Sequence, residues 1–222
     1  MQKEVRLQNT QDLLHRAQRE KRPFLHRIVT GDESWLYCYD PETKQQSSQW
    51  VALGEQRPQK ARQLRFTGKV MVVVFFDAEG VLYHRYLGVG ETITADLYTD
   101  ILKSLVDAVR RKRPDLRNQG WMLLHDNARP HTAKVVGEFL HRNNIDVLPH
   151  PPYSPDLAPC DFWLFSHLKK PLRGRQFSSV NELMHASNEV LRNISKDGLL
   201  FVFEKWRDRL QSCIQAGGSY FE

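Results

Sequence analysis

The sequence is poor in cysteine and has no long apolar run. Its 222 residues include three cysteines, Cys38, Cys160 and Cys213, which lie far apart and never in a CxxC spacing. An odd number of isolated cysteines argues against a secreted disulfide scaffold and against a zinc module of the usual kind. No stretch approaches the roughly 18 consecutive apolar residues of a membrane span, and the first twenty residues are too polar for a signal peptide. We therefore expect a soluble, intracellular protein in a reducing compartment, with no membrane partner.

Internal repeats and low-complexity tracts are also absent from the sequence, and the excess of positive charge is modest. The chain has 32 lysines and arginines against 26 aspartates and glutamates, which gives a net charge of +6. A basic excess is compatible with binding a polyanion such as nucleic acid. A solvated basic surface produces the same composition, so charge alone does not decide between the two.

The order of predicted elements indicates an α/β fold. Periodicity and capping residues predict a helix over 3–20 that Pro23 ends, a long strand over 24–39, strands over 69–76 and 81–87, a helix over 94–111 capped by Thr94, a strand over 121–124, a helix over 132–142, a strand over 146–148, a helix after Pro159, and two helices between 180 and 215. The apolar run KVMVVVFF is typical of a strand buried on both faces. This order matches the ribonuclease-H-like fold, a mixed five-stranded sheet flanked by helices.

Two long segments fit neither helix nor strand. Residues 40–68 are polar, contain proline and glycine, and carry Lys60, Arg62 and Arg65. A loop of this length inside a domain is usually functional or disordered. The second segment, PHPPYSPDLAP over 149–159, has too many prolines for regular structure and is predicted to be an extended connector.

Three aspartates stand where a metal-dependent enzyme needs them. Asp32 lies in the first strand, Asp126 follows a short apolar strand, and Asp161 lies in the first turn of a helix, where the helix dipole favours a carboxylate. If the first and fourth strands are neighbours, Asp32 and Asp126 come together. Converging carboxylates repel one another unless a divalent cation neutralises them, and two such ions can promote displacement at phosphorus.

Each aspartate also has an ordinary structural explanation. Asp32 is compatible with a turn beside Gly31, Asp126 with an Asx turn, and Asp161 with a simple helix start. Asp156, in the same connector, competes for the third position. Spacing alone leaves these alternatives open.

Longer motifs carry more information than the spacing. The blocks TGDESW, LLHDNARPHTA and PYSPDLAPCDFWLF occur in this order, and 34 residues lie between Asp126 and Asp161. Each block resembles a signature of the mariner transposases, and the spacing is the one that distinguishes that group. The resemblance extends over nearly the whole chain, from the helix before FLHRIVTGDE to the terminal GGSYFE.

The resemblance implies the roles of particular residues. By position, Asp32, Asp126 and Asp161 match the catalytic metal-binding triad of the family, which uses Mg²⁺ or Mn²⁺ with two ions per active site, and Asp156 becomes a connector residue. Residues 40–68 resemble the family's clamp loop, which reaches a second subunit, so a homodimer is expected. The basic side chains that become candidate DNA contacts are Lys60, Arg62, Arg65 and Lys69.

Further roles stay open at this stage. Around the second carboxylate, His125, Asn127, Arg129 and His131 are candidates either to orient it or to contact DNA, and His131 is also compatible with a packed residue at the start of a helix. The basic run RRKRP at 110–114 resembles a nuclear-targeting cluster, although a solvated basic helix end explains it equally simply. The family resemblance implies a nuclear protein.

The expected organisation is a linker helix over 1–22 and a ribonuclease-H-like catalytic domain over 23–222. The expected activity is metal-dependent DNA cleavage at transposon ends followed by strand transfer into target DNA. Family members begin with helix-turn-helix modules that recognise those ends, and no room for them exists before residue 20. Two alternatives follow: a domesticated, non-catalytic module for DNA binding or dimerisation, and a structure-specific nuclease acting on RNA or hybrid duplexes.

Overall fold

A mixed sheet forms the centre of the molecule. The computed structural model describes residues 2–40, 68–88, 90–194 and 198–220. The strands, in the spatial order β3-β2-β1-β4-β5, are β1 (Ile28–Tyr37), β2 (Lys69–Asp77), β3 (Gly80–Tyr86), β4 (Met122–Leu124) and β5 (Asp146–Val147). The first three are antiparallel neighbours, whereas β4 runs parallel to both β1 and β5. The predicted mixed five-stranded sheet is therefore confirmed.

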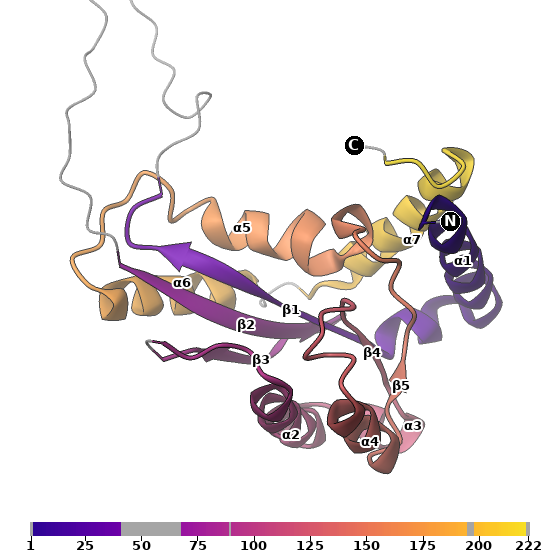
Figure 1. The fold of residues 1–222 in the computed structure, drawn as a ribbon, viewed down its shortest axis with the longest axis horizontal. Helices are drawn as coiled ribbons and strands as arrows, with labels where there is room; N and C mark the ends of the chain where they lie inside the picture. Colours follow the sequence, from indigo (N-terminus) through magenta and orange to yellow (C-terminus); the bar gives the residue numbers. More distant parts are fainter. Residues whose placement is uncertain (1, 41–67, 89, 195–197, 221–222) are drawn as a thin grey trace, which may run out of the picture.

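Helices cover both faces of this sheet (Figure 1). One layer contains α2 (Ala95–Lys112), α3 (Pro114–Gln119) and α4 (Lys134–Arg142). The other contains α1 (Gln2–His26), α5 (Phe165–Lys169), α6 (Val180–Ile194) and α7 (Leu200–Gln215), with α1 packed on α7. A 3₁₀ turn (Pro155–Leu157) and a π-helical turn (Cys160–Leu164) precede α5. Among the described elements, the sequence patterns did not predict the short helix α3 or the 3₁₀ turn at Pro155–Leu157.

The side chains of β2 explain why the sheet needs two layers. Successive residues of a strand point to opposite faces. Val72, Val74 and Phe76 pack with the layer of α1 and α5–α7, while Val73 and Phe75 pack with the layer of α2–α4, and all five are fully buried. The run KVMVVVFF is thus buried on both faces, as its continuous apolar character predicts.

The predicted boundary between the first helix and the first strand was wrong. Pro23 lies inside α1, which continues to His26, so β1 begins at Ile28 and not at Phe24. A proline costs the helix one backbone hydrogen bond and some steric strain. Phe24 and Leu25 are almost fully buried, and burying two such side chains contributes roughly 1.5–3 kcal/mol each, which offsets that cost. The boundary expected between residues 22 and 23 therefore falls inside this helix.

The basic run at 110–114 ends α2 and is partly engaged. Arg113 donates from Nε to Asp77 Oδ2 at 2.7 Å, and Asp77 is 1% exposed. Lys112 Nζ donates to the carbonyl of Leu82 at 2.8 Å. These contacts join the end of α2 to the β2–β3 hairpin. In the part of the chain described, no helix is both long and apolar enough to cross a membrane.

Candidate active site

Asp32 lies in the middle of β1, opposite Val74 of β2. The preceding residue, Gly31, pairs with Phe75, and a Cβ atom on Gly31 would stand 2.1 Å from Phe75 Cδ1. Only glycine leaves room for that ring. Packing against Phe75 therefore requires glycine in the TGD motif. The glycine lets β1 pair closely with β2 at the position next to Asp32.

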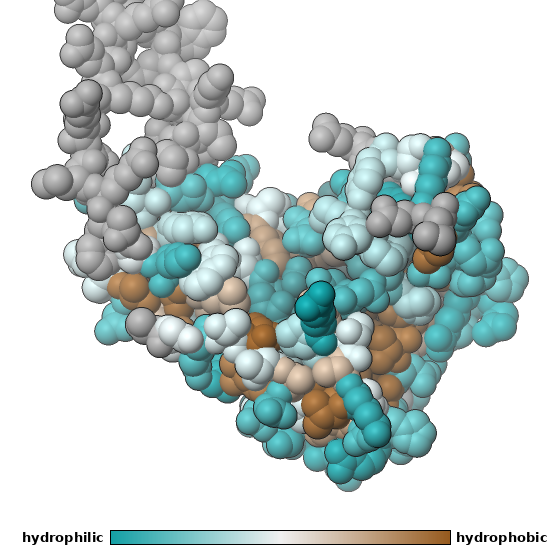
Figure 2. Space-filling model, in the orientation of Figure 1, coloured by the Kyte–Doolittle hydropathy of each residue, from teal (hydrophilic) through white to brown (hydrophobic). Residues whose placement is uncertain are grey.

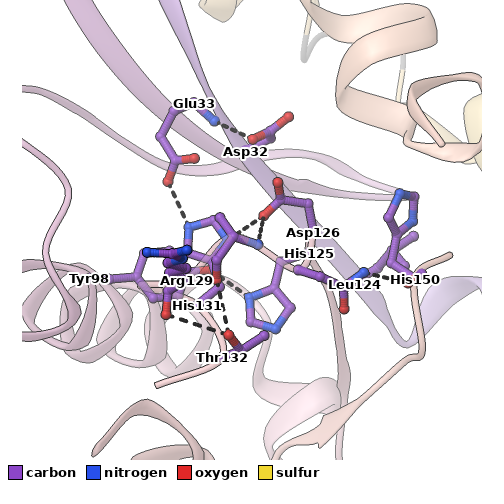
Figure 3. Close-up of polar contacts among 12 residues, drawn as sticks. Asp32, Glu33, Tyr98, Leu124, His125, Asp126, Arg129, His131, Thr132 and His150 are labelled. Atoms are coloured by element: carbon purple, nitrogen blue, oxygen red, sulfur yellow. Dashed lines mark hydrogen bonds and ion pairs between the residues drawn. The ribbon is translucent and has the colours of Figure 1, made fainter. Parts of the chain in front are cut away.

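Parallel pairing of β1 with β4 brings the first two acids together. Thr30 pairs with Leu124, and its hydroxyl donates to the carbonyl of Leu124 at 3.0 Å. Asp32 and Asp126 each follow this matched pair by two positions, so they lie side by side at the point where β4 ends. Figure 3 shows their carboxylates on the same side of the two strands.

Asp161 completes the group from a different part of the chain. It lies in the π-helical turn, and its N–H donates to the carbonyl of Ala158 at 3.0 Å. Burial and then the charge of Asp126 raise the pKa of Asp161. Burial, followed by the charges of Glu33, Asp161 and Asp126, raises the pKa of Asp32 to about 8. The three predicted acids therefore lie within electrostatic reach of one another.

His131 joins Asp126 to a carboxylate that sequence analysis did not single out, Glu33. The His131 ring is 3% exposed, with Nδ1 2.6 Å from Asp126 Oδ1 and Nε2 3.2 Å from Glu33 Oε1 (Figure 3). Burial acts to lower the pKa of His131, but its two carboxylate partners outweigh burial and raise it to about 9. The ring is thus a cation donating to both carboxylates. Adjacency to Asp32 was the only sequence signal for Glu33.

A stack of rings holds His131 in place. The Tyr98 ring, from α2, lies 4.0 Å from the His131 ring between centroids, and the Tyr98 hydroxyl is 2.8 Å from Nδ1 of His125. Burial, with a smaller effect of His131, lowers the pKa of His125 to about 3, so His125 is neutral. Asn127 donates to the carbonyl of His150 at 2.6 Å and ties this loop to the proline-rich connector. Sequence analysis had no signal for Tyr98.

Asp126 and Asp156, the rival for the third position, differ in how far hydrogen bonds already engage their carboxylate oxygens. Oδ1 of Asp126 accepts from Ala128 N and faces His131, as in an Asx turn, while its Oδ2 accepts no hydrogen bond from the described residues. The rival Asp156 is bound through both oxygens by Arg6. Both oxygens of Asp156 are therefore engaged, whereas the described residues engage only Oδ1 of Asp126.

These oxygens fit a divalent cation. Mg²⁺ and Mn²⁺ prefer hard oxygen ligands, and a bound cation would relieve the mutual repulsion that raises the pKa of Asp32 and Asp161. Within the described residues, no three His, Cys, Asp or Glu side chains already stand in a complete coordinating arrangement. Coordination would therefore draw the carboxylates closer together than they lie here.

The predicted DNA contacts are dispersed. Lys69 is exposed at the start of β2, with Nζ 4.2 Å above the Trp35 ring. It pairs with Tyr37, five positions along β1 from Asp32, or about 17 Å at the rise of a strand. Arg129 is exposed in the loop after Asp126. The predicted contacts Lys60, Arg62 and Arg65, with the clamp-like loop, lie outside the described residues.

The chain is similar to known transposases. Residues 40–118 match the family Transposase (partial DDE domain). The chain is 36% identical over its full length to the Mariner Mos1 transposase of Drosophila mauritiana, covering 63% of that protein. It also superimposes on the crystal structure of the catalytic domain of Mos1 mariner transposase with a TM-score of 0.80 and 34% identity, covering 96% of that chain.

The chain belongs to the mariner transposase family. As a mariner-family domain it has the ribonuclease-H-like fold that the order of elements predicted. A second relative is the human Histone-lysine N-methyltransferase SETMAR, at 36% identity over all of this chain. The mariner-family chain spans about a third of SETMAR and just under two thirds of the Mos1 transposase. These shares limit the comparison to the part of each relative that is matched.

Proposed function

We propose that this mariner-family domain is a metal-dependent DNA endonuclease and strand transferase. The observation that carries the proposal is the convergence of Asp32, Asp126 and Asp161, from three separate segments, beside the end of β4. Structures of the Mos1 transposase include paired-end complexes with Mn and with Mg and a strand transfer complex. By analogy, the substrates here are transposon ends and target DNA.

The three aspartates would hold two Mg²⁺ or Mn²⁺ ions. Such ions activate a water or a DNA 3′-hydroxyl and stabilise the leaving oxygen in an in-line displacement. The chain supplies no covalent nucleophile in this scheme. His131 and Glu33 keep Asp126 in one orientation with Oδ1 engaged, which leaves Oδ2 as the oxygen that would hold a cation.

DNA contacts follow from charge. We assign phosphate contacts to the exposed Lys69 and Arg129 and to Lys60, Arg62 and Arg65 of the clamp-like loop, while a direct DNA contact by the buried His131 stays a prediction. Burial and the charge of Asp126 raise the pKa of Asp161, and the charge of Lys169, on α5, acts against them, so Lys169 is a further candidate near the reacting phosphate. Figure 2 shows hydrophilic side chains gathered over the hollowed centre of one face.

A homodimer through the clamp-like loop and a nuclear location complete the proposal.

One observation favours a second function. The SETMAR match places a segment like this one inside a protein named for a different activity. A non-catalytic module for DNA binding or dimerisation would need the fold but no metal. The intact carboxylate triad favours the catalytic function over this alternative.

Nicking of supercoiled plasmid in Mn²⁺ at low salt tests the proposal. We expect wild type to nick, Asp126→Asn and Asp161→Asn to lose at least a hundredfold in rate, and Asp107→Asn, a surface carboxylate, to match wild type. Wild type that binds the plasmid without nicking it would support the non-catalytic module. Cleavage of RNA–DNA hybrid in preference to duplex DNA would instead identify a structure-specific nuclease.

A further inference from the structure

The proline-rich connector determines where Asp161 lies. The N–H groups of Asp161 and Phe162 both donate to the carbonyl of Ala158, each at 3.0 Å, so the turn that presents Asp161 is built on the last residues of the connector. Beyond one 3₁₀ turn at Pro155–Leu157, the connector has no regular structure. Its prolines lack N–H donors, so its position depends on side chains from other elements.

Arg6, near the start of α1, makes the central contact to the connector. Its Nη1 and Nη2 donate to Oδ1 and Oδ2 of Asp156 at 2.8 and 2.5 Å, and its side chain is 5% exposed against 11% for Asp156. A bidentate pair between a guanidinium and a carboxylate fixes both distance and orientation. The pair spans 150 residues of sequence and ends five residues before Asp161.

Other contacts to the connector come from the C-terminal region and lie next to the Arg6–Asp156 pair. Arg209 Nη1 donates to the carbonyl of Asp156 at 3.1 Å, and Trp206 Nε1 donates to the carbonyl of Leu157 at 3.0 Å. The Arg6 guanidinium also lies 4.7 Å from the centroid of the Tyr220 ring. The connector is therefore held between α1 and α7. Arg6 binds the side chain of Asp156, whereas Arg209 and Trp206 bind backbone carbonyls.

We infer that Arg6 is a positioning residue for the third metal-binding carboxylate, acting through Asp156 on Asp161. This inference rests on the proposed function, because it concerns the carboxylate that completes the metal site. Losing the bidentate pair frees the connector, and Asp161 then samples positions outside coordinating reach of Asp32 and Asp126. A purely structural pair would lower thermal stability and leave metal affinity unchanged.

Mn²⁺ affinity, measured by titration calorimetry well below the unfolding temperature, separates these roles. We expect Arg6→Gln and Asp156→Asn to weaken Mn²⁺ binding at least fivefold, and Arg6→Lys, which keeps one charged donor, to lose less. Arg19→Gln, an exposed arginine on the same helix, is the matched control and should bind as wild type does. Lower thermal stability with Mn²⁺ affinity within twofold of wild type would overturn the inference.

Nicking assays distinguish failure of this inference from failure of the proposed function. We expect Arg6→Gln to need a Mn²⁺ concentration at least fivefold higher for half-maximal nicking and to approach the wild-type rate at saturation. Wild type that binds Mn²⁺ and never nicks would refute the proposed function, while the calorimetric comparison would still decide the role of Arg6. Should Arg6→Gln not fold, Arg6→Lys and Asp156→Asn carry the same comparison.

Discussion

At the scale of single residues, the charge of the site is distributed in an unequal way. The pKa of Asp32 is raised because this side chain is buried among other carboxylates. Burial acts in the same direction on Asp126, but hydrogen bonds from His131 and Ala128 outweigh it and lower the pKa of Asp126. Two neighbouring aspartates therefore differ in their readiness to ionise. The difference arises from His131, which lies beside only one of them.

Glu33→Gln tests the role of His131. Removing the negative charge that faces Nε2 lowers the pKa of His131 and weakens its hold on Asp126. Loss of a group that orients a metal ligand typically costs 10–100-fold in activity, so we expect nicking in Mn²⁺ to slow by about tenfold. Glu138→Gln, an exposed carboxylate of α4, serves as control, and a Glu33→Gln rate within twofold of wild type would contradict this role.

His84 gives a pH-dependent stability on β3, where it pairs with Val74, the β2 residue that also pairs with Asp32. Burial lowers its pKa below the usual value, with Lys112 and Arg192 adding to the effect, against a hydrogen bond to Asn188 of 2.7 Å that raises it. The folded state therefore keeps His84 neutral while the unfolded chain binds a proton below pH ~6.5. Its contribution to stability is complete above that pH and falls as the pH drops.

We expect His84→Gln to make unfolding less sensitive to acid. Between pH 7 and pH 5, the unfolding temperature of wild type should fall further than that of the variant, because only wild type carries a histidine whose pKa is lowered by folding. Thermal unfolding followed by circular dichroism measures the difference. The exposed His26→Gln should keep the wild-type slope, and equal slopes for His84→Gln would show that this histidine does not contribute.

At the scale of elements, the close pairing of β1 with β2 depends on Gly31, because the Phe75 ring fills the space that a side chain would need. Gly31→Ala places a methyl group inside the Phe75 ring position, 2.1 Å from its Cδ1. Overpacking of this kind costs about 1–3 kcal/mol or more, so we expect the unfolding temperature to drop by several degrees. Gly31→Ala combined with Phe75→Leu should recover part of the loss. Unchanged stability of the single variant would mean that β1 and β2 can separate without cost.

The start of α2 is a second element with a specific requirement. Thr94 accepts a hydrogen bond from Leu97 N at 3.2 Å, as its predicted capping role requires, and the same helix presents Tyr98 to His131. Loss of a threonine cap costs about 1 kcal/mol. We expect Thr94→Ala to lose about that much in urea denaturation and Thr94→Ser to retain most of it. If Thr94→Ser lost as much stability as Thr94→Ala, the hydroxyl hydrogen bond to Leu97 N would not be the source of the stabilisation.

At the scale of the whole molecule, the acidic site joins segments from both halves of the chain, so metal binding should stabilise the entire fold. A ligand at a hundredfold excess over its Kd adds about 2.7 kcal/mol, which is roughly 5–10 °C in unfolding temperature here. We expect Mn²⁺ to raise the unfolding temperature of wild type by this amount and EDTA to reverse it. Asp161→Asn should show no such rise, and a rise equal to that of wild type would exclude Asp161 as a ligand.

The sequence by itself determined most of the elements and the family. A continuous apolar run placed the β2 strand, and periodicity with the Thr94 cap placed the α2 helix, since both are local patterns. Three long motifs identified the mariner transposases and the three aspartates. The end of α1 was missed, because the burial of Phe24 and Leu25 outweighs the local effect of Pro23.

Only the tertiary structure decided which side chains serve the aspartates. Nothing local in the sequence links Glu33 to His131, 98 positions away, or Arg6 to Asp156, 150 positions away. Those pairs form because the parallel alignment of β1 with β4, and the packing of α1 on α7, bring distant segments into contact. Local patterns fix helices and strands, but the energies of buried charges depend on neighbours that only the folded chain supplies.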